Sequence, residues 1–211
     1  MTESLHRRGL LRALLAAGAS TAAVSLAGLP LAGCSEAKPN FNGVDLTGAD
    51  YARDFKLADA EGKTRTLADF KGKVVVMFFG YAQCPDVCPT TMTEMAQVKK
   101  DLGKDGDRLQ VLFVTVDPER DTPEVMKAYM GAFDPSFVAL IPTPEELPAL
   151  AKDYKVYYKK VEGKTPTSYS MDHSAASYVY DPQGRLRLYE RYGIETPALV
   201  ADLRALLNGS A

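Results

Sequence analysis

The chain has 211 residues, of which 46% are hydrophobic, and its 25 basic and 27 acidic side chains give a formal net charge of −2. These values are typical of a globular protein with one domain of moderate size and an appendage. No Lys/Arg-rich run is present, so the composition argues against a nucleic-acid partner. The three cysteines cannot make a disulfide-stapled mini-protein, and the chain also has only two histidines. A site built from these residue types must use nearly all of them.

Residues 1–33 are predicted to be an export signal. Arg7, Arg8 and Arg12 precede a stretch rich in Ala and Leu that carries no charge until Glu36, as in the basic and apolar regions of a signal peptide. The paired arginines and the leucines after them resemble a twin-arginine signal. His6 stands where that pattern usually has Ser or Thr, so export by the general secretory route stays open.

The apolar stretch ends in Leu-Ala-Gly-Cys at residues 31–34, which resembles a bacterial lipobox. There the peptide is cut before the cysteine, whose thiol is acylated. The alternative is an uncleaved membrane helix, since roughly 20 apolar residues span a bilayer, but the glycines and Pro30 disfavour it. We therefore expect lipidation at Cys34 and a lipidated tether over 34–50. The domain at 51–211 would then be anchored on the outer, periplasmic face of the bacterial cytoplasmic membrane.

The residues after the tether are predicted to alternate between strands and helices. In chain order we expect a hairpin at 55–66, a buried strand at 74–79, a helix from Pro89, a buried strand at 109–116, a helix from Asp121, a strand at 137–141, a helix from Thr143, a hairpin at 177–189 and a helix at 196–207. The buried strands are apolar without alternation, which indicates a sheet covered on both faces. This order predicts an α/β, thioredoxin-like sandwich with an N-terminal β-hairpin and inserted elements.

Cys84 and Cys88 lie between the first buried strand and the helix that follows it. A helix N-terminus stabilises a thiolate and so lowers the pKa of a cysteine placed there. A spacing of four within a first helical turn puts both sulfurs on one side. A purely structural disulfide is disfavoured, because a loop of three intervening residues removes little entropy from the unfolded chain. We therefore interpret the two cysteines as a functional pair.

The pair suits either disulfide exchange or a soft metal ion. Exchange enzymes of the thioredoxin type usually separate their cysteines by two residues, whereas three intervene here. A metal site needs a third ligand, and His173 is the only histidine left once the signal peptide and His6 are removed. A lone histidine is by default an ordinary polar residue, but the loop before the late hairpin approaches the cysteine turn in thioredoxin-like folds. Two thiolates and an imidazole suit Cu(I) or Cu(II), and also Zn(II) with an added water.

Three motifs in order resemble those of the Sco/SenC family: residues 80–92 around the cysteines, residues 116–123 and residues 172–174. The likeness covers nearly all of residues 50–207, although Ala-Gln at 82–83 replaces the commoner Thr-His. The resemblance implies a thioredoxin-like, membrane-tethered protein that binds one copper ion, as Cu(I) or Cu(II), through Cys84, Cys88 and His173. It also implies assembly of the dinuclear copper A site of cytochrome c oxidase, with the copper A subunit and other periplasmic copper carriers as partners.

Two functions stay open at this point. In the first, the protein is a metallochaperone, not an enzyme, and passes copper to the oxidase. In the second, Cys84 and Cys88 are the redox pair of a thiol–disulfide reductase that keeps the copper-ligand cysteines of the oxidase reduced. A peroxidase is less favoured, because no separate peroxidatic arrangement is present. We assign no chemistry to residues 117–123, and we expect Asp86 to cap a helix.

Cys34→Ser should abolish lipid attachment and leave an unprocessed precursor, because the lipobox reaction modifies this thiol. Mass spectrometry of the protein recovered from cells measures both effects. A wild-type mature chain that begins elsewhere and carries no acyl group would contradict the assignment.

Overall fold

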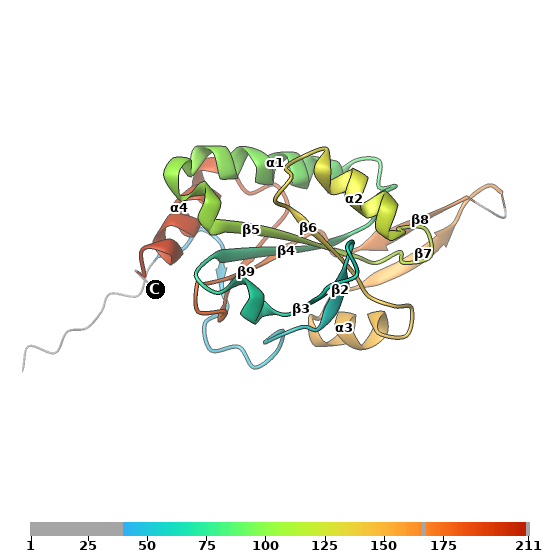
Figure 1. Ribbon diagram of the computed structural model, residues 1–211, viewed down its shortest axis with the longest axis horizontal. Coiled ribbons are helices and arrows are strands. Elements are labelled where there is room, and N and C mark those ends of the chain that lie inside the picture. Colours follow the sequence, from blue (N-terminus) through green and yellow to red (C-terminus); the bar gives the residue numbers. More distant parts are fainter. Residues whose placement is uncertain (1–39, 166–167, 210–211) are drawn as a thin grey trace, which may run out of the picture. The chain divides into compact units, whose positions relative to one another are not determined.

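Two parallel strands, β4 (Val74–Gly80) and β5 (Leu109–Thr115), form the centre of the sheet, and every residue in both is buried. This confirms the prediction of strands covered on both faces. The computed structural model describes residues 40–165 and 168–209 (Figure 1). The expected export signal at 1–33 and the expected lipidation site Cys34 lie outside these residues.

The main sheet has eight strands in the order β1-β10-β9-β4-β5-β6-β2-β3. β4, β5 and β6 run parallel to one another, whereas the outer strands pair antiparallel. β6 spans Val138–Ile141, and the outer strands are β1 (Val44–Asp45), β2 (Leu57–Asp59), β3 (Thr64–Arg65), β9 (Ser177–Tyr180) and β10 (Leu186–Glu190). A separate two-stranded sheet pairs β7 (Tyr158–Glu162) with β8 (Tyr169–His173).

Helices cover both faces of the main sheet, with α1 and α2 on one face and α3 on the other (Figure 1). The helices are α1 (Val87–Asp101), α2 (Pro123–Gly131), α3 (Leu147–Asp153) and α4 (Thr196–Leu207), with short 3-10 helices η1 (Leu67–Phe70) and η2 (Gly103–Arg108). α1 buries Met92, Met95 and Val98, which are three residues apart and so lie along one apolar face of the helix. α4 packs against α1 and β4. The expected α/β sandwich with an N-terminal hairpin is confirmed.

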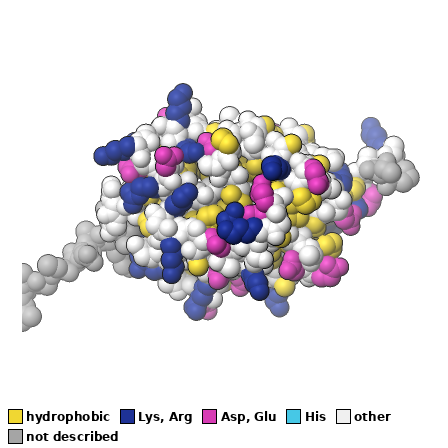
Figure 2. Space-filling view, in the orientation of Figure 1, with side chains coloured by type: hydrophobic (Ala, Val, Ile, Leu, Met, Phe, Trp, Pro, Cys, Tyr) yellow, Lys and Arg dark blue, Asp and Glu magenta, His cyan; other side chains and the backbone are white. Residues whose placement is uncertain are grey.

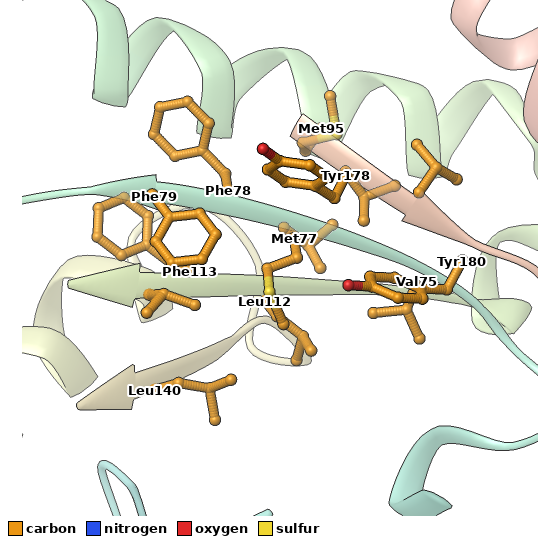
Figure 3. Packing of buried hydrophobic residues seen from close by; sticks show 14 of the residues in the cluster. Val75, Met77, Phe78, Phe79, Met95, Leu112, Phe113, Leu140, Tyr178 and Tyr180 are labelled. Carbon is orange, nitrogen blue, oxygen red and sulfur yellow. The ribbon is translucent and has the colours of Figure 1, made fainter. Parts of the chain in front are cut away.

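Aromatic side chains fill the core around the central strands (Figure 3). The ring of Phe79 lies 5.2 Å from that of Tyr154 and 6.3 Å from that of Tyr178, measured between centroids. The hydroxyl of Tyr178 donates to the carbonyl of Tyr154, and that of Tyr180 donates to the carbonyl of Ala52 at 2.8 Å. These two buried phenols are therefore hydrogen-bonded, as burial of a polar group requires.

The folded domain begins before residue 51, although the sequence predicts a tether as far as residue 50. β1 pairs with β10, and the backbone N–H groups of Asn42 and Gly43 donate to the Asp202 carboxylate of α4 at 2.8–3.0 Å. The prediction treated this small, polar stretch as a linker because its composition is that of one. Its place in the fold comes from partners that are more than 140 residues away in the sequence, which a local pattern does not reveal.

The hairpin of β7 and β8 is the main element that the sequence did not predict. Four of the five residues in β7 are exposed, so the strand lacks the alternation of a half-buried strand. α3 also begins later than the expected start at Thr143. Reciprocal hydrogen bonds between Thr143 and Glu146, at 2.9 and 3.2 Å, close a turn ahead of the helix.

The surface of the described residues has few features that single out one class of partner. On the face that Figure 2 shows, acidic and basic side chains are interspersed, so neither sign dominates the local field. Within the described ranges, none of the helices combines the length and the apolar character needed to cross a membrane.

Glu190, the last residue of β10, is buried beside Asp202 and Gly43. Among the described residues, no hydrogen-bond donor reaches either oxygen of its carboxyl group. Burial first, and then the neighbouring charge of Asp202, raise the pKa of Glu190 from the ordinary 4.5 to about 7. The folded protein therefore binds this proton more tightly than the unfolded chain does.

The stability that this proton contributes is fully present below about pH 4.5 and is lost as the pH rises through about 7. Glu190→Gln should thus raise the free energy of unfolding at pH 8 by on the order of 2 kcal/mol, with little effect at pH 4. Urea unfolding at the two pH values measures this. Glu162→Gln, which removes the same charge from an exposed strand, is the control, and an equal effect of both variants at pH 8 would contradict the account.

Candidate metal centre

The two cysteines lie on the turn that joins β4 to α1. Cys88 is in the first turn of α1 and fully buried, whereas Cys84 precedes the helix and is partly exposed. The backbone N–H of Cys88 donates to the Cys84 sulfur at 3.5 Å. The sulfurs thus converge as predicted, but through this turn and not, as expected, from one helical turn that contains both.

His173 brings a third donor to the cysteine pair from the end of β8. Its Nε2 atom lies 3.4 Å from the Cys88 sulfur. The two sulfurs and a ring nitrogen of His173 all lie within 4.8 Å of one another. The structure therefore brings together all three residues that the sequence analysis singled out.

The backbone fixes which nitrogen of His173 faces the sulfurs. Nδ1 lies 2.9 Å from the carbonyl oxygen of Ser174, and a carbonyl only accepts, so Nδ1 carries the hydrogen. The lone pair of Nε2 is then directed toward Cys88. The rings of Phe78 and Tyr81 stand edge-on to the imidazole, with centroids 5.9 and 5.8 Å away. A histidine oriented in this way is prepared to bind a metal.

Burial sets the protonation states of the centre. It raises the pKa of the Cys88 thiol far above its ordinary value and lowers the pKa of His173 below its own. Our expectation of a lowered thiol pKa at the helix N-terminus is wrong for Cys88, because desolvation outweighs the helix dipole. The metal-free centre therefore holds a protonated Cys88 and a neutral imidazole at pH 7. A bound cation would displace the thiol proton.

Asp86 does not have the role that we expected. It is the residue before α1, but its side chain is exposed and makes no capping hydrogen bond. It instead lines an open depression of about 260 Å³ together with Cys84, Pro85, Val87, Met171, Asp172, His173 and Ala175. Cys84 and His173 are thus accessible from solvent, whereas Cys88 lies on the buried side of the centre.

Asp121 is a supporting residue whose role the sequence analysis missed. We expect a helix to start at Asp121, but Thr122 is the residue that caps α2 and Asp121 is wholly buried. Its Oδ2 atom accepts from the N–H of Ala82 at 3.0 Å and from the hydroxyl of Thr115 at 2.6 Å. Asp121 therefore ties the cysteine turn to the end of β5. An Asp before Thr-Pro has the pattern of a helix cap, so no local signal distinguishes this role.

Gly80 allows the turn to pass close to the buried sulfur. A methyl group at this position would lie 2.8 Å from the Cys88 sulfur, and 2.7 and 2.8 Å from the rings of Phe78 and Phe113. Contacts this short force neighbouring atoms to move. Only glycine fits here without displacing a ligand atom.

Gly80→Ala should destabilise the fold by about 1–3 kcal/mol through overpacking and increase the reactivity of the Cys88 thiol by moving it. Denaturant unfolding and alkylation kinetics measure the two effects. Gly131→Ala is the matched control, because no atom outside its own stretch of helix lies within 4 Å of the added methyl group, and it should be neutral or stabilise by up to about 1 kcal/mol. Equal results for the two variants would contradict the close approach.

Comparisons with known proteins place the chain in a family. The family model described as SCO1/SenC matches residues 44–208. The SCO2-like protein of Rickettsia felis is 34% identical over 133 residues, covering 63% of this chain and 65% of that protein. The chain spans about half to two thirds of the length of the curated relatives it matches.

Two solved structures support the same assignment. ScoI of Bradyrhizobium japonicum with copper bound is 41% identical, with a TM-score of 0.66, covering 72% of this chain and 97% of that one. Apo Sco1 of Thermus thermophilus is 40% identical, with a TM-score of 0.70, covering 79% and 97%. These likenesses confirm the thioredoxin-like architecture. With a family model that spans almost the whole described domain, they show that the chain belongs to the SCO1/SenC family.

Proposed function

We propose that this protein binds one copper ion through Cys84, Cys88 and His173 and delivers it to the copper A site of cytochrome c oxidase during assembly of the enzyme. The observation that carries the proposal is the convergence of two sulfurs and a ring nitrogen within 4.8 Å. The Nδ1 hydrogen bond of His173 leaves its Nε2 lone pair free to take part.

The donor set favours copper over other ions. Thiolate sulfur is a soft ligand that suits Cu(I), and the imidazole lets one site accept Cu(II) as well. Zn(II) would need a fourth ligand such as water. The copper in the related Bradyrhizobium japonicum structure and the motif resemblance to Sco/SenC proteins support copper here.

The geometry suits copper as cargo. Cys84 and His173 border an open depression, so the ligands of a partner can approach the ion from outside. The buried Cys88 must lose its proton when copper binds and regain one when copper leaves. Transfer is then an exchange of ligands on an accessible ion, and protonation of Cys88 favours release. The copper A subunit of the oxidase is the proposed recipient, and other periplasmic copper carriers are proposed donors.

The proposed location follows from the sequence before the described domain. Removal of residues 1–33 and acylation of Cys34 would hold the domain at the outer, periplasmic face of the bacterial cytoplasmic membrane. Two or three acyl chains anchor a protein stably where a single chain does not. Because β1 already belongs to the domain, the tether in this proposal is shorter than the sequence suggested.

A second candidate is reduction of the cysteines that will hold copper in the oxidase. It is favoured by one observation: Cys84 is accessible while Cys88 is buried beside it. The Cys84 thiolate would attack a substrate disulfide and expel one thiolate, giving a mixed disulfide. Cys88, on losing its proton, would then attack the Cys84 sulfur. The substrate leaves as a dithiol, and a Cys84–Cys88 disulfide remains.

His173→Ala separates the two candidates, because copper capture needs the third donor and disulfide exchange uses sulfur alone. We expect the variant to bind copper weakly and to lose oxidase assembly. It should still reduce a disulfide-bonded copper A domain in vitro, and added copper should partly restore assembly in cells. Copper binding, reductase turnover and oxidase content measure these effects.

Asp172→Asn is the control, since this exposed neighbour lines the same depression and is not a proposed ligand. It should behave as the wild type in all three assays. If His173→Ala cells assemble oxidase normally at low copper, delivery is not the essential task, and the reductase function is then the better account.

A further inference from the structure

Arg120, in the loop between β5 and α2, contacts three segments of the chain that are distant in sequence. Its Nε atom donates to the Asp117 carboxylate at 2.5 Å. Its Nη1 atom donates to the side-chain oxygen of Gln83 at 3.2 Å and to the backbone carbonyl of Tyr169 at 2.9 Å. One planar guanidinium therefore joins its own loop, the cysteine turn and β8.

Tyr169 completes the arrangement. The guanidinium carbon of Arg120 lies 3.5 Å from the centroid of the Tyr169 ring, and the Tyr169 hydroxyl donates to Asp117 at 2.8 Å. The three side chains thus form a closed set in which each contacts the other two. The remaining Nη2 atom of Arg120 is buried and has no acceptor among the described residues. That loss of hydration weakens any purely stabilising role.

Both segments that Arg120 bridges carry proposed ligands. Gln83 directly precedes Cys84, and Tyr169 is the first residue of β8, which ends at His173. Among the described strands, β8 pairs only with β7, so no strand of the main sheet fixes its position by hydrogen bonding. After His173 the chain soon enters β9, whose Ser177 pairs with Phe78 of β4. The start of β8 has no such backbone link to the main sheet, and there Arg120 supplies a side-chain bridge to the cysteine turn.

We infer that Arg120 is a positioning residue for copper: it holds the Cys84 turn and the His173 strand at the separation that the ion requires. Asp117 and Tyr169 orient the guanidinium for this task. The inference rests on the proposed three-ligand copper site and assigns a function to the loop that the sequence analysis left without one.

Arg120→Ala should lower the copper affinity of the reduced protein by about 10- to 100-fold, the usual effect of removing a residue that orients metal ligands. It should also change the sulfur-to-copper absorption of the Cu(II) form. Arg120→Lys keeps the positive charge, but a single ammonium group cannot contact all three acceptors as the planar guanidinium does. This variant should therefore restore little of the affinity. Competition titration and absorption spectra with copper alone measure these effects.

Arg185→Ala is the matched control. Arg185 also donates through Nε to a buried carboxylate, that of Asp181, at 2.7 Å. That pair follows β9 at the end where Tyr180 pairs with Val75, far along β4 from Gly80. The Arg185→Ala variant should therefore keep the copper affinity and the absorption spectrum of the wild type, even if its free energy of unfolding is lower.

A double-mutant cycle with His173→Ala tests the positioning role itself. Without the histidine ligand there is no separation to maintain, so Arg120→Ala should cause no further loss of affinity in that background. Tyr169→Phe, which removes only the hydroxyl contact with Asp117, provides a milder variant if Arg120→Ala does not fold. Wild-type affinity in the Arg120 variants, or equal losses with and without His173, would overturn the inference. Absence of copper binding by the wild type would instead refute the proposed function.

Discussion

The close approach of the chain to the Cys88 sulfur at the end of β4 determines the geometry of the whole centre. β4 is buried along its full length, and Gly80 is the last residue that its pairing with β5 holds in place. Because no side chain stands at this position, the turn can fold back over the sulfur. α1 then begins with Cys88 inside the core and leaves Cys84 outside. The asymmetry between a buried and an accessible thiol is thus a consequence of sheet packing.

This asymmetry links metal binding to protonation. A fully buried thiol with a raised pKa stays neutral in the metal-free protein, which avoids an uncompensated charge in the core. A bound copper ion takes the place of the thiol proton, and its positive charge compensates the buried thiolate, which then serves as a ligand. His173 complements this chemistry because its own lowered pKa keeps the imidazole neutral and ready to bind. The centre is therefore stable when empty and can still capture a soft ion.

Sequence patterns predicted the parts of the fold that local periodicity determines, namely the central strands, the late hairpin and the helix after the cysteines. They also predicted the three converging residues, because Cys84, Cys88 and His173 are the only cysteines and the only histidine in the sequence after residue 34. Tertiary burial was not predictable from these patterns. Three features depend on contacts between distant segments: the pKa of Cys88, which is raised and not lowered as expected, the buried carboxylate of Asp121, and the exposed hairpin that carries His173.

The central claim is that the two cysteines and His173 form one copper site, and the copper content of the purified protein tests it most directly. With thiols counted on the same sample, the reduced protein should bind one copper ion per chain. It should show sulfur-to-copper charge transfer with Cu(II), and oxidation of the pair to a disulfide should prevent binding. Undiminished copper binding by a Cys84→Ala, Cys88→Ala double variant would place the site elsewhere and contradict the account.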